Sequence, residues 1–299
     1  MASNKTPNLG LDIWQPEDFF KRAEVNNNFT KIDSNSAEQL IKIENLQRET
    51  STSVAINQSD IEKIAHRGFS ALAPENTLVA MELAVAYGAD SLEWDTQISS
   101  DGVPVVIHDD SVDRTTNGTG IVKNMTLAQL KALDAGVKYS PLYSGVTIPT
   151  LDEVLTFAKL KSKYIYPEIK NYRTTSDISI MVNKIVDYGF ENNCVLQSFN
   201  HSDFYYVRAI NKNITLGYLV SNETQFLSAL TSAGADGNAM ILSSAGVVLN
   251  NPSLVVLARN QGVGIAVWTV DSSYQVQDLI SIGVNRFMSN HVKGDVVSL

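Results

Sequence analysis

Two histidines and two acidic residues lie within one short part of this sequence. His66 and His108 are two of only four histidines, and Glu93 and Asp95 stand two positions apart in the run SLEWDTQI. Histidine exchanges protons near neutral pH, and paired carboxylates attract a hard cation. Alternate residues of a strand point to the same side, so both carboxylates are expected to face one site. The four residues together predict metal-assisted acid–base chemistry, with the two histidines as the catalytic groups.

A third carboxylate, Glu168, occurs in the run YPEIK, with Lys170 two residues later. We expect Glu168 to join Glu93 and Asp95 as ligands of a divalent metal, either Ca²⁺ or Mg²⁺, because these ions prefer oxygen ligands. The alternative is that the three acids pair with Arg67 or Lys170 and bind no metal. Either histidine could act as the base and the other as the acid.

Strand and helix patterns alternate after residue 60, which is typical of repeated β–α units in an α/β protein. Nine strands are predicted, at residues 61–65, 91–97, 104–107, 164–168, 195–198, 215–220, 239–242, 264–269 and 286–289. The short turn with Asp101 and Gly102 predicts a β-hairpin, because a parallel crossover needs a longer connection. The other eight strands predict a (β/α)8 TIM barrel over residues 61–299, with a loop insertion at residues 109–149.

The predicted barrel brings the candidate residues together. Functional residues of such barrels lie where the strands end. His66 follows the first predicted strand, and Glu168 ends another. If the hairpin turns at Asp101 and Gly102, His108 comes to lie roughly opposite Asp95.

The string HRG…PENT…EWD…DG-x-PV-x-x-HD…RTT-x-G-x-G, which begins at His66, resembles the signature of glycerophosphodiester phosphodiesterases. The resemblance extends over about residues 61–299. It implies a TIM barrel that cleaves glycerophosphodiesters, with the three acids as metal ligands and the two histidines as general acid and base. One position departs from the family pattern. The last strand ends in Asn290, where family members commonly have Thr-Asp, and we expect a changed pocket edge with activity retained.

Five further residues are candidates for substrate contacts. Arg67 can donate to two phosphate oxygens at once, unless it serves as a structural partner of the acids, and Lys170 supplies a second positive charge. Asn76, in PENT, either binds the phosphate or metal shell or caps the following helix. Trp268 faces the pocket mouth or belongs to the barrel core. Phe199, in LQSFN, matches a family pattern in which the phenyl ring packs near the substrate.

The first sixty residues differ from the barrel. Residues 1–30 resemble the attachment segment of some bacteriophage tail and baseplate proteins. Residues 31–60 carry a weak heptad pattern, which predicts a helical linker or a short coiled coil joining three chains. A homotrimeric virion tail protein would act at the bacterial cell surface, as a depolymerase of polyglycerol-phosphate teichoic acid. The alternatives are a cytoplasmic enzyme that hydrolyses deacylated phospholipids and a receptor-binding protein with an inactive barrel.

Composition argues against several other classes. The net charge of −9, without a cluster of basic residues, argues against nucleic-acid binding. The sequence has no apolar run of about 18 residues and no signal-peptide pattern at MASNKTPNLG, so neither a membrane span nor a signal peptide is expected. The single cysteine, Cys194, excludes an internal disulfide and is expected to be buried.

Overall fold

The structure, a computed structural model, describes residues 4–5, 12–13 and 61–291. In the N-terminal part, strand β1 (Asn4–Lys5) pairs antiparallel with strand β2 (Asp12–Ile13). Residues 31–60, predicted as a helical linker or a short coiled coil, and most of the predicted attachment segment over residues 1–30 lie outside the described residues.

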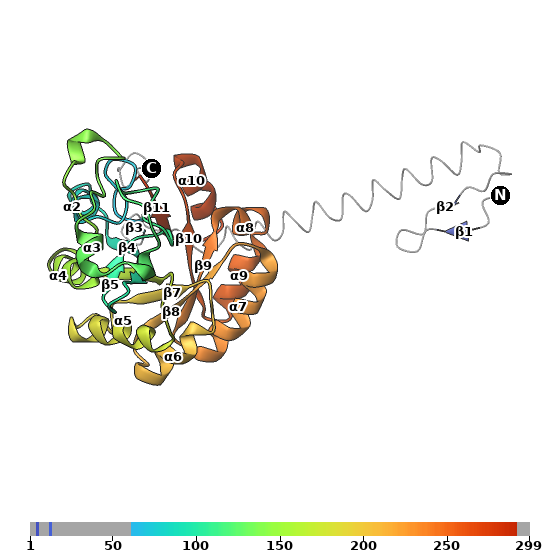
Figure 1. Cartoon of the computed structure of the whole chain (residues 1–299). Helices are drawn as coiled ribbons and strands as arrows, with labels where there is room; N and C mark the ends of the chain where they lie inside the picture. Colours follow the sequence, from blue (N-terminus) through green and yellow to red (C-terminus); the bar gives the residue numbers. More distant parts are fainter. Residues whose placement is uncertain (1–3, 6–11, 14–60, 292–299) are drawn as a thin grey trace. The chain divides into compact units, whose positions relative to one another are not determined.

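Residues 61–291 form a closed barrel of parallel strands with helices around it (Figure 1). The eight barrel strands are β3 (Glu62–Ala65), β4 (Ser91–Ile98), β6 (Tyr164–Ile169), β7 (Val195–Ser198), β8 (Thr215–Val220), β9 (Ala239–Ser244), β10 (Gly264–Trp268) and β11 (Arg286–Ser289). Strand β11 pairs with β3, which closes the barrel. The predicted TIM barrel is therefore confirmed, and most strand bounds agree within one or two residues.

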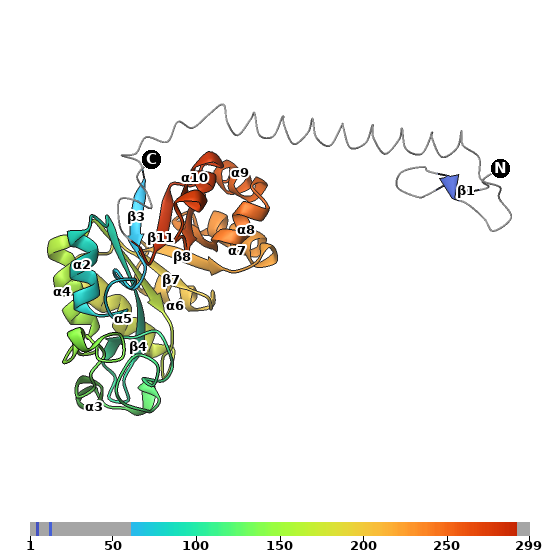
Figure 2. The same ribbon diagram turned by 90° about the horizontal axis from the view of Figure 1, so that it is seen from above.

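Helices cover the outside of the barrel (Figures 1 and 2). They are α2 (Leu78–Ala86), α4 (Leu151–Lys161), α5 (Ser176–Asp187), α6 (Asp203–Ile210), α7 (Glu223–Asp236), α8 (Ala245–Asn250), α9 (Ser253–Asn260) and α10 (Ser273–Ser281). Thr77, Thr150 and Asn222 cap α2, α4 and α7, because their side-chain oxygens accept a backbone N–H of the first turn. Outward-facing strand residues such as Leu92 and Trp94 are fully buried beneath the helices.

The other face of each strand points into the barrel. Tyr166, Leu242 and Met288 belong to a compact apolar cluster in this interior. Glu93 and Asp95 lie on the inward face of β4 and are both buried. The strand period of two residues therefore places apolar packing and the candidate carboxylates on the same inner surface.

The predicted hairpin and insertion are also present. Strand β5 (Pro104–Val106) returns antiparallel beside β4, and Gly102 at the turn adopts φ +87°, a conformation that favours glycine. The insertion that follows contains η2 (Val122–Asn124), α3 (Leu127–Lys131) and η3 (Pro141–Tyr143). Its own small apolar core includes Val112, Leu130 and Ile148. This packing makes the insertion a structured wall beside the end of β4.

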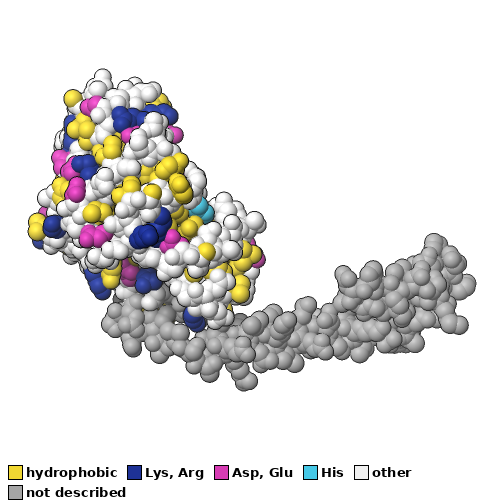
Figure 3. Space-filling view, turned by 90° about the horizontal axis from the view of Figure 1, so that it is seen from below, with side chains coloured by type: hydrophobic (Ala, Val, Ile, Leu, Met, Phe, Trp, Pro, Cys, Tyr) yellow, Lys and Arg dark blue, Asp and Glu magenta, His cyan; other side chains and the backbone are white. Residues whose placement is uncertain are grey.

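The described residues were expected to contain no membrane-spanning helix and to bury the single cysteine. No helix of the described residues is long and apolar enough to cross a membrane. Cys194 is buried, as expected. On the face drawn in Figure 3, lysine and arginine side chains lie close to acidic ones, with hydrophobic side chains between them.

Candidate active site

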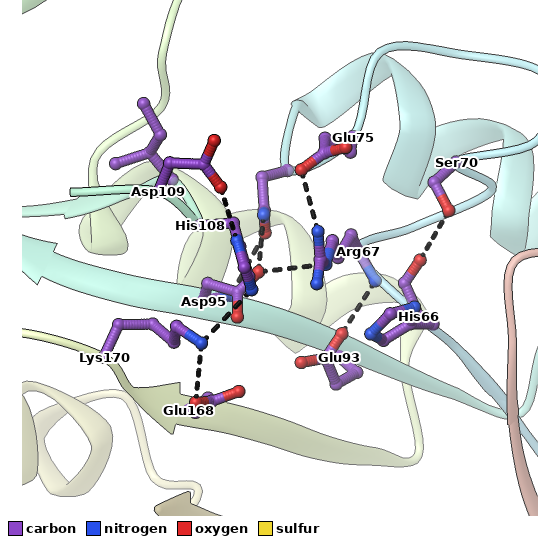
Figure 4. Close-up of polar contacts among 12 residues, drawn as sticks. His66, Arg67, Ser70, Glu75, Glu93, Asp95, His108, Asp109, Glu168 and Lys170 are labelled. Carbon is purple, nitrogen blue, oxygen red and sulfur yellow. Dashed lines mark hydrogen bonds and ion pairs between the residues drawn. The ribbon is translucent and has the colours of Figure 1, made fainter. Parts of the chain in front are cut away.

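Three carboxylates from two neighbouring strands converge near the C-terminal end of the barrel (Figure 4). Asp95 on β4 stands opposite Glu168 on β6 in the strand register, and Glu93 lies on the same inner face. One oxygen from each carboxylate lies within 4.8 Å of the other two, and all three residues are buried. Such a cluster of oxygen ligands could hold a divalent metal.

The electrostatics of the cluster also fit a bound cation. Burial, and then the charge of Asp95, raise the pKa of Glu93 well above its usual value. The same two causes raise the pKa of Glu168 to about 8. Gln197 donates to Glu93 over 3.0 Å and keeps its own buried Oε1 without a hydrogen-bond partner among the described residues. A divalent cation would favour the ionised carboxylates, and Gln197 has a free acceptor beside them.

His66 follows β3, and its orientation is set by a chain of contacts that ends at Asp271. The imidazole Nδ1 lies 2.8 Å from Asn290 Oδ1. Asn290 donates its side-chain Nδ2 and its backbone N–H to Asp271, over 2.7 and 2.8 Å. These two bonds keep the amide oxygen turned to the ring, so Nδ1 carries the proton and Nε2 keeps its lone pair. Burial, and then the charge of Arg67, lower the pKa of His66 below the usual value, which keeps the ring neutral at neutral pH.

His108 reaches the same cluster from the hairpin. The backbone N–H of Ile107 donates to the carbonyl of Asp95, which brings the next residue beside the carboxylates. His108 Nδ1 lies 2.6 Å from Asp109 Oδ1, and Lys170 Nζ lies 3.2 Å from Nε2. Lys170 also pairs with Glu168 over 3.1 Å. The two predicted catalytic histidines therefore approach one acidic cluster from different elements (Figure 4).

Two residues with left-handed backbone hold the acids in place. Arg67 has φ +57° and Asn76 has φ +59°, a conformation that costs a non-glycine residue about 1–2 kcal/mol. The Arg67 backbone N–H donates to Glu93 over 2.7 Å. Asn76 donates to the Asp95 carboxylate over 2.7 Å and accepts the Asp95 backbone N–H over 3.1 Å. These contacts offset the strain and orient two of the three carboxylates.

Arg67 and Asn76 both contact the acids through their side chains. The Arg67 guanidinium pairs with Glu75 at 3.0 Å and lies 3.3 Å from Asp95, so it is a partner of the acids, and its contact with phosphate stays a prediction. Asn76 binds Asp95 and does not cap the helix, because Thr77 is the cap of α2. Asn76 therefore supports the expected metal shell.

Two aromatic residues form part of the opposite rim. Phe199 follows β7 and is 46% exposed, and its ring meets the ring of Trp268 edge to face with centroids 5.7 Å apart. Trp268 Nε1 donates to the carbonyl of Leu242 over 2.8 Å, and its ring also packs against the apolar interior of the barrel. Lys170 Nζ lies 6.0 Å from the centre of the Phe199 ring. Phe199 and Trp268 thus present an aromatic wall beside the positive charge of Lys170.

Sequence reasoning missed Asp271 and the partner of His108. Asp271 stands three residues after Trp268, and Asp109 directly follows His108, so both are acids just beyond strand ends. Arg114 from the insertion binds both Asp109 and Glu75, at 2.7 Å each, and this pairing lowers the pKa of both carboxyl groups. Asp271 and Asp109 could both have been identified from the sequence as acidic residues that come shortly after a predicted strand.

Known proteins resemble the chain both in sequence and in structure. The pattern of the glycerophosphoryl diester phosphodiesterase family matches residues 66–293. A glycerophosphodiester phosphodiesterase of Caldanaerobacter subterraneus is 35% identical over 233 residues, which cover 76% of this chain and 93% of that protein. One from Bacillus altitudinis is 33% identical with the same coverage.

Two solved structures extend the likeness. A phosphodiesterase from Oleispira antarctica, in complex with the product sn-glycerol-3-phosphate, superposes with a TM-score of 0.74 at 27% identity. The alignment covers 81% of this chain and 98% of that one. A glycerophosphodiester phosphodiesterase from Agrobacterium tumefaciens gives a TM-score of 0.69 at 25% identity, over 79% of this chain and 99% of that one.

Proposed function

The chain belongs to the glycerophosphoryl diester phosphodiesterase family and is a glycerophosphodiester phosphodiesterase, and we propose that its substrate is polyglycerol-phosphate teichoic acid. The buried cluster of Glu93, Asp95 and Glu168, with an imidazole reaching it from each of two elements, is the observation that carries the chemistry. We further propose that Ca²⁺ or Mg²⁺ bound to the three acids is required for activity.

Phosphodiester cleavage needs charge neutralisation, a base for the nucleophile and an acid for the leaving oxygen. When bound, the divalent cation supplies neutralisation of a phosphate oxygen and polarisation of the nucleophile. His66, neutral and with Nε2 free, accepts the proton of the attacking hydroxyl. Lys170 turns from His108 Nε2 to the phosphate oxygens, to which Arg67 also donates, and His108, then protonated at Nε2, gives that proton to the departing glycerol oxygen. The attacking hydroxyl belongs to water or to the neighbouring glycerol, which would first form a cyclic phosphate.

An activated substrate separates the two histidine roles. We expect His66→Ala and His108→Ala each to abolish cleavage of glycerophosphocholine. With glycerol 3-(4-nitrophenyl phosphate), whose leaving group needs no proton, only His108→Ala should regain activity. His201→Ala is the matched control, since His201 bonds the carbonyl of Leu219 outside the cluster. Full activity of either mutant on glycerophosphocholine would refute the assignment.

The substrate proposal rests on two supports. Teichoic acid of this type is a chain of glycerophosphodiesters, and residues 1–30 resemble a phage attachment segment. Formation of phosphate monoesters from the purified polymer and from glycerophosphocholine should be compared with Ca²⁺, with Mg²⁺ and with chelator. Preferred, metal-dependent cleavage of the polymer supports the proposal. Cleavage of glycerophosphocholine alone would favour the second candidate, a hydrolase of deacylated phospholipids.

We also propose that the protein is a homotrimer of the phage tail, bound to tail or baseplate proteins through residues 1–60 and acting at the bacterial surface. The support is the heptad pattern within residues 31–60. Light scattering should give a trimer for the full chain and a monomer for residues 61–299. A monomeric full chain would contradict this assembly.

A further inference from the structure

Hollows open on both sides of the acidic cluster. One, of about 440 Å³, lies beside His66 and Asn290, at the ends of β3 and β11. The other, of about 410 Å³, lies beside Glu168 and Phe199, at the ends of β6 and β7. Strand β4 stands between β3 and β6 in the barrel order, so the two hollows flank the carboxylates from opposite sides. The acidic cluster is therefore open in two directions along the C-terminal end of the barrel.

The hollow beside His66 continues outward along the insertion. A further hollow of about 190 Å³ shares Ser70 and Glu75 with it and extends past Arg114 to Lys138 and Tyr139. We call these two connected hollows the insertion arm. Contacts link the arm to the centre, because Arg67 binds Glu75 at 3.0 Å and Glu75 binds Arg114 at 2.7 Å.

The insertion arm holds one cation that has no acidic partner among the described residues. Arg67, Arg114 and Lys138 line the arm, but Arg67 pairs with Glu75 and Asp95 and Arg114 pairs with Glu75 and Asp109, so Lys138 supplies the unpaired positive charge. Lys138 is exposed, its amine donates to the backbone carbonyl of Asp113, and it forms no ion pair within residues 61–291. The chain as a whole carries a net charge of −9. An unpaired positive charge in a groove attracts an anionic ligand.

The insertion arm is held in shape before any ligand binds. The hydroxyls of Tyr139 and Tyr143 donate to the backbone carbonyls of Ala71 and Leu72, over 2.7 and 2.6 Å. The two tyrosine rings also pack edge to face, with centroids 5.6 Å apart. These contacts tie the insertion to the loop after β3, so little ordering is needed on binding.

The opposite hollow has a different character. Beyond Glu168, Lys170 and Asp203, it is lined by hydroxyl and amide groups of Tyr172, Asn171 and Asn200 beside the ring of Phe199. Such groups suit the hydroxyls and carbon chain of glycerol, whereas the insertion arm suits phosphate. A repeating chain of glycerol and phosphate matches this alternation across the centre.

We propose that a poly(glycerol phosphate) chain lies across the acidic cluster, with the phosphate next to the cleaved one held in the insertion arm by Lys138, and that internal bonds are cut. This inference rests on the proposed polymer substrate. Overall, each cut adds one water across a P–O bond, which leaves a hydroxyl on one fragment and a phosphate monoester on the other. A site that took only chain ends would need a wall on one side, and the two hollows leave both sides open.

The size of the products tests the direction of cutting. Unsubstituted poly(glycerol phosphate), labelled at one end, is digested by the full chain and followed by gel mobility and by release of glycerol phosphate. Oligomers of mixed length should appear before the monomer accumulates. Monomer release from the first time point, with chains shortened one unit at a time, overturns the inference but leaves the proposed substrate standing. An intact polymer beside cleaved glycerophosphocholine overturns the proposed substrate and the inference with it.

A charge variant tests the insertion arm. Lys138→Gln should raise KM for the polymer, relative to KM for glycerophosphoglycerol, by about two- to fivefold, as expected for one exposed ionic contact. The polymer KM of the variant should also depend less steeply on salt. Lys212→Gln is the matched control, because this exposed lysine lies between α6 and β8, at the other end of the barrel. Equal KM ratios in Lys138→Gln and the unmutated protein would refute the phosphate contact.

Discussion

Replacing Asn290 by alanine tests whether this residue positions His66. The side-chain amide oxygen of Asn290 lies 2.8 Å from His66 Nδ1 and also accepts a hydrogen bond from the Ser70 hydroxyl over 2.8 Å. The substitution removes both contacts but leaves the imidazole, the three acids and the metal shell unchanged. We expect kcat to fall while KM changes little, because the contact strengthens only when His66 takes up a proton.

The size of the effect follows from the change of charge. A hydrogen bond between neutral groups contributes about 0.5–1.5 kcal/mol, and one to a charged group about 1.5–3 kcal/mol. When His66 takes up the proton of the attacking hydroxyl, its hydrogen bond to Asn290 changes from one between neutral groups to one that involves a charged group. Its loss should raise the barrier by the difference, about 1–1.5 kcal/mol, which lowers kcat about five- to twelvefold.

Asp271→Ala supplies the second half of the experiment. Without Asp271 the Asn290 amide can turn over, and about equal populations of the two orientations lower kcat about twofold. Because Asp271 acts through Asn290, the double variant should be no slower than Asn290→Ala alone. Initial rates with glycerophosphocholine give kcat and KM, and thermal unfolding shows that each variant is folded. Additive losses in the double variant, or an unchanged kcat in Asn290→Ala, would refute the reasoning.

Three further predictions concern pH and packing. The fold raises the pKa of Glu168 to about 8, so the protonated carboxyl stabilises the metal-free protein fully below pH 4.5, and this stabilisation is lost as the pH rises through about 8. The midpoint temperature of thermal unfolding should therefore fall between pH 4.5 and 8, and it should fall less in Glu168→Gln. Added Ca²⁺ or Mg²⁺ should restore the midpoint most at high pH. Because the pKa of His66 is lowered, the acid limb of kcat/KM should lie below pH 6.5, and a limb above that value would contradict the base role. Gly136→Ala should destabilise the protein by about 1–3 kcal/mol in denaturant titration, because its Cβ would meet the Tyr143 carbonyl at 1.9 Å, whereas Gly246→Ala, with open space around it, should not.

The barrel could be predicted because strand patterns are local. The period of two on β4, and the short turn at Gly102, need no knowledge of the rest of the chain. Helix α7 has a weak helical pattern in the sequence, because several serines, threonines and Gly234 interrupt it. It forms because Phe226 and Leu230 are buried in the core between helices and barrel, and such packing outweighs intrinsic propensity.

For the site, the residue types and their places at strand ends predicted which acids and histidines would converge. The partners that orient them were not predictable in the same way. His66 and Asn290 are separated by 224 positions, and only closure of the barrel between β3 and β11 brings them into contact.

The sequence by itself determined that Glu93 and Asp95 share a face, because that depends on the strand period alone. Only the tertiary structure decided that Asp95 stands opposite Glu168 and that Lys138 lines a groove leading to the centre. Strand register and the docking of the insertion depend on contacts between distant parts of the chain, which no local pattern encodes.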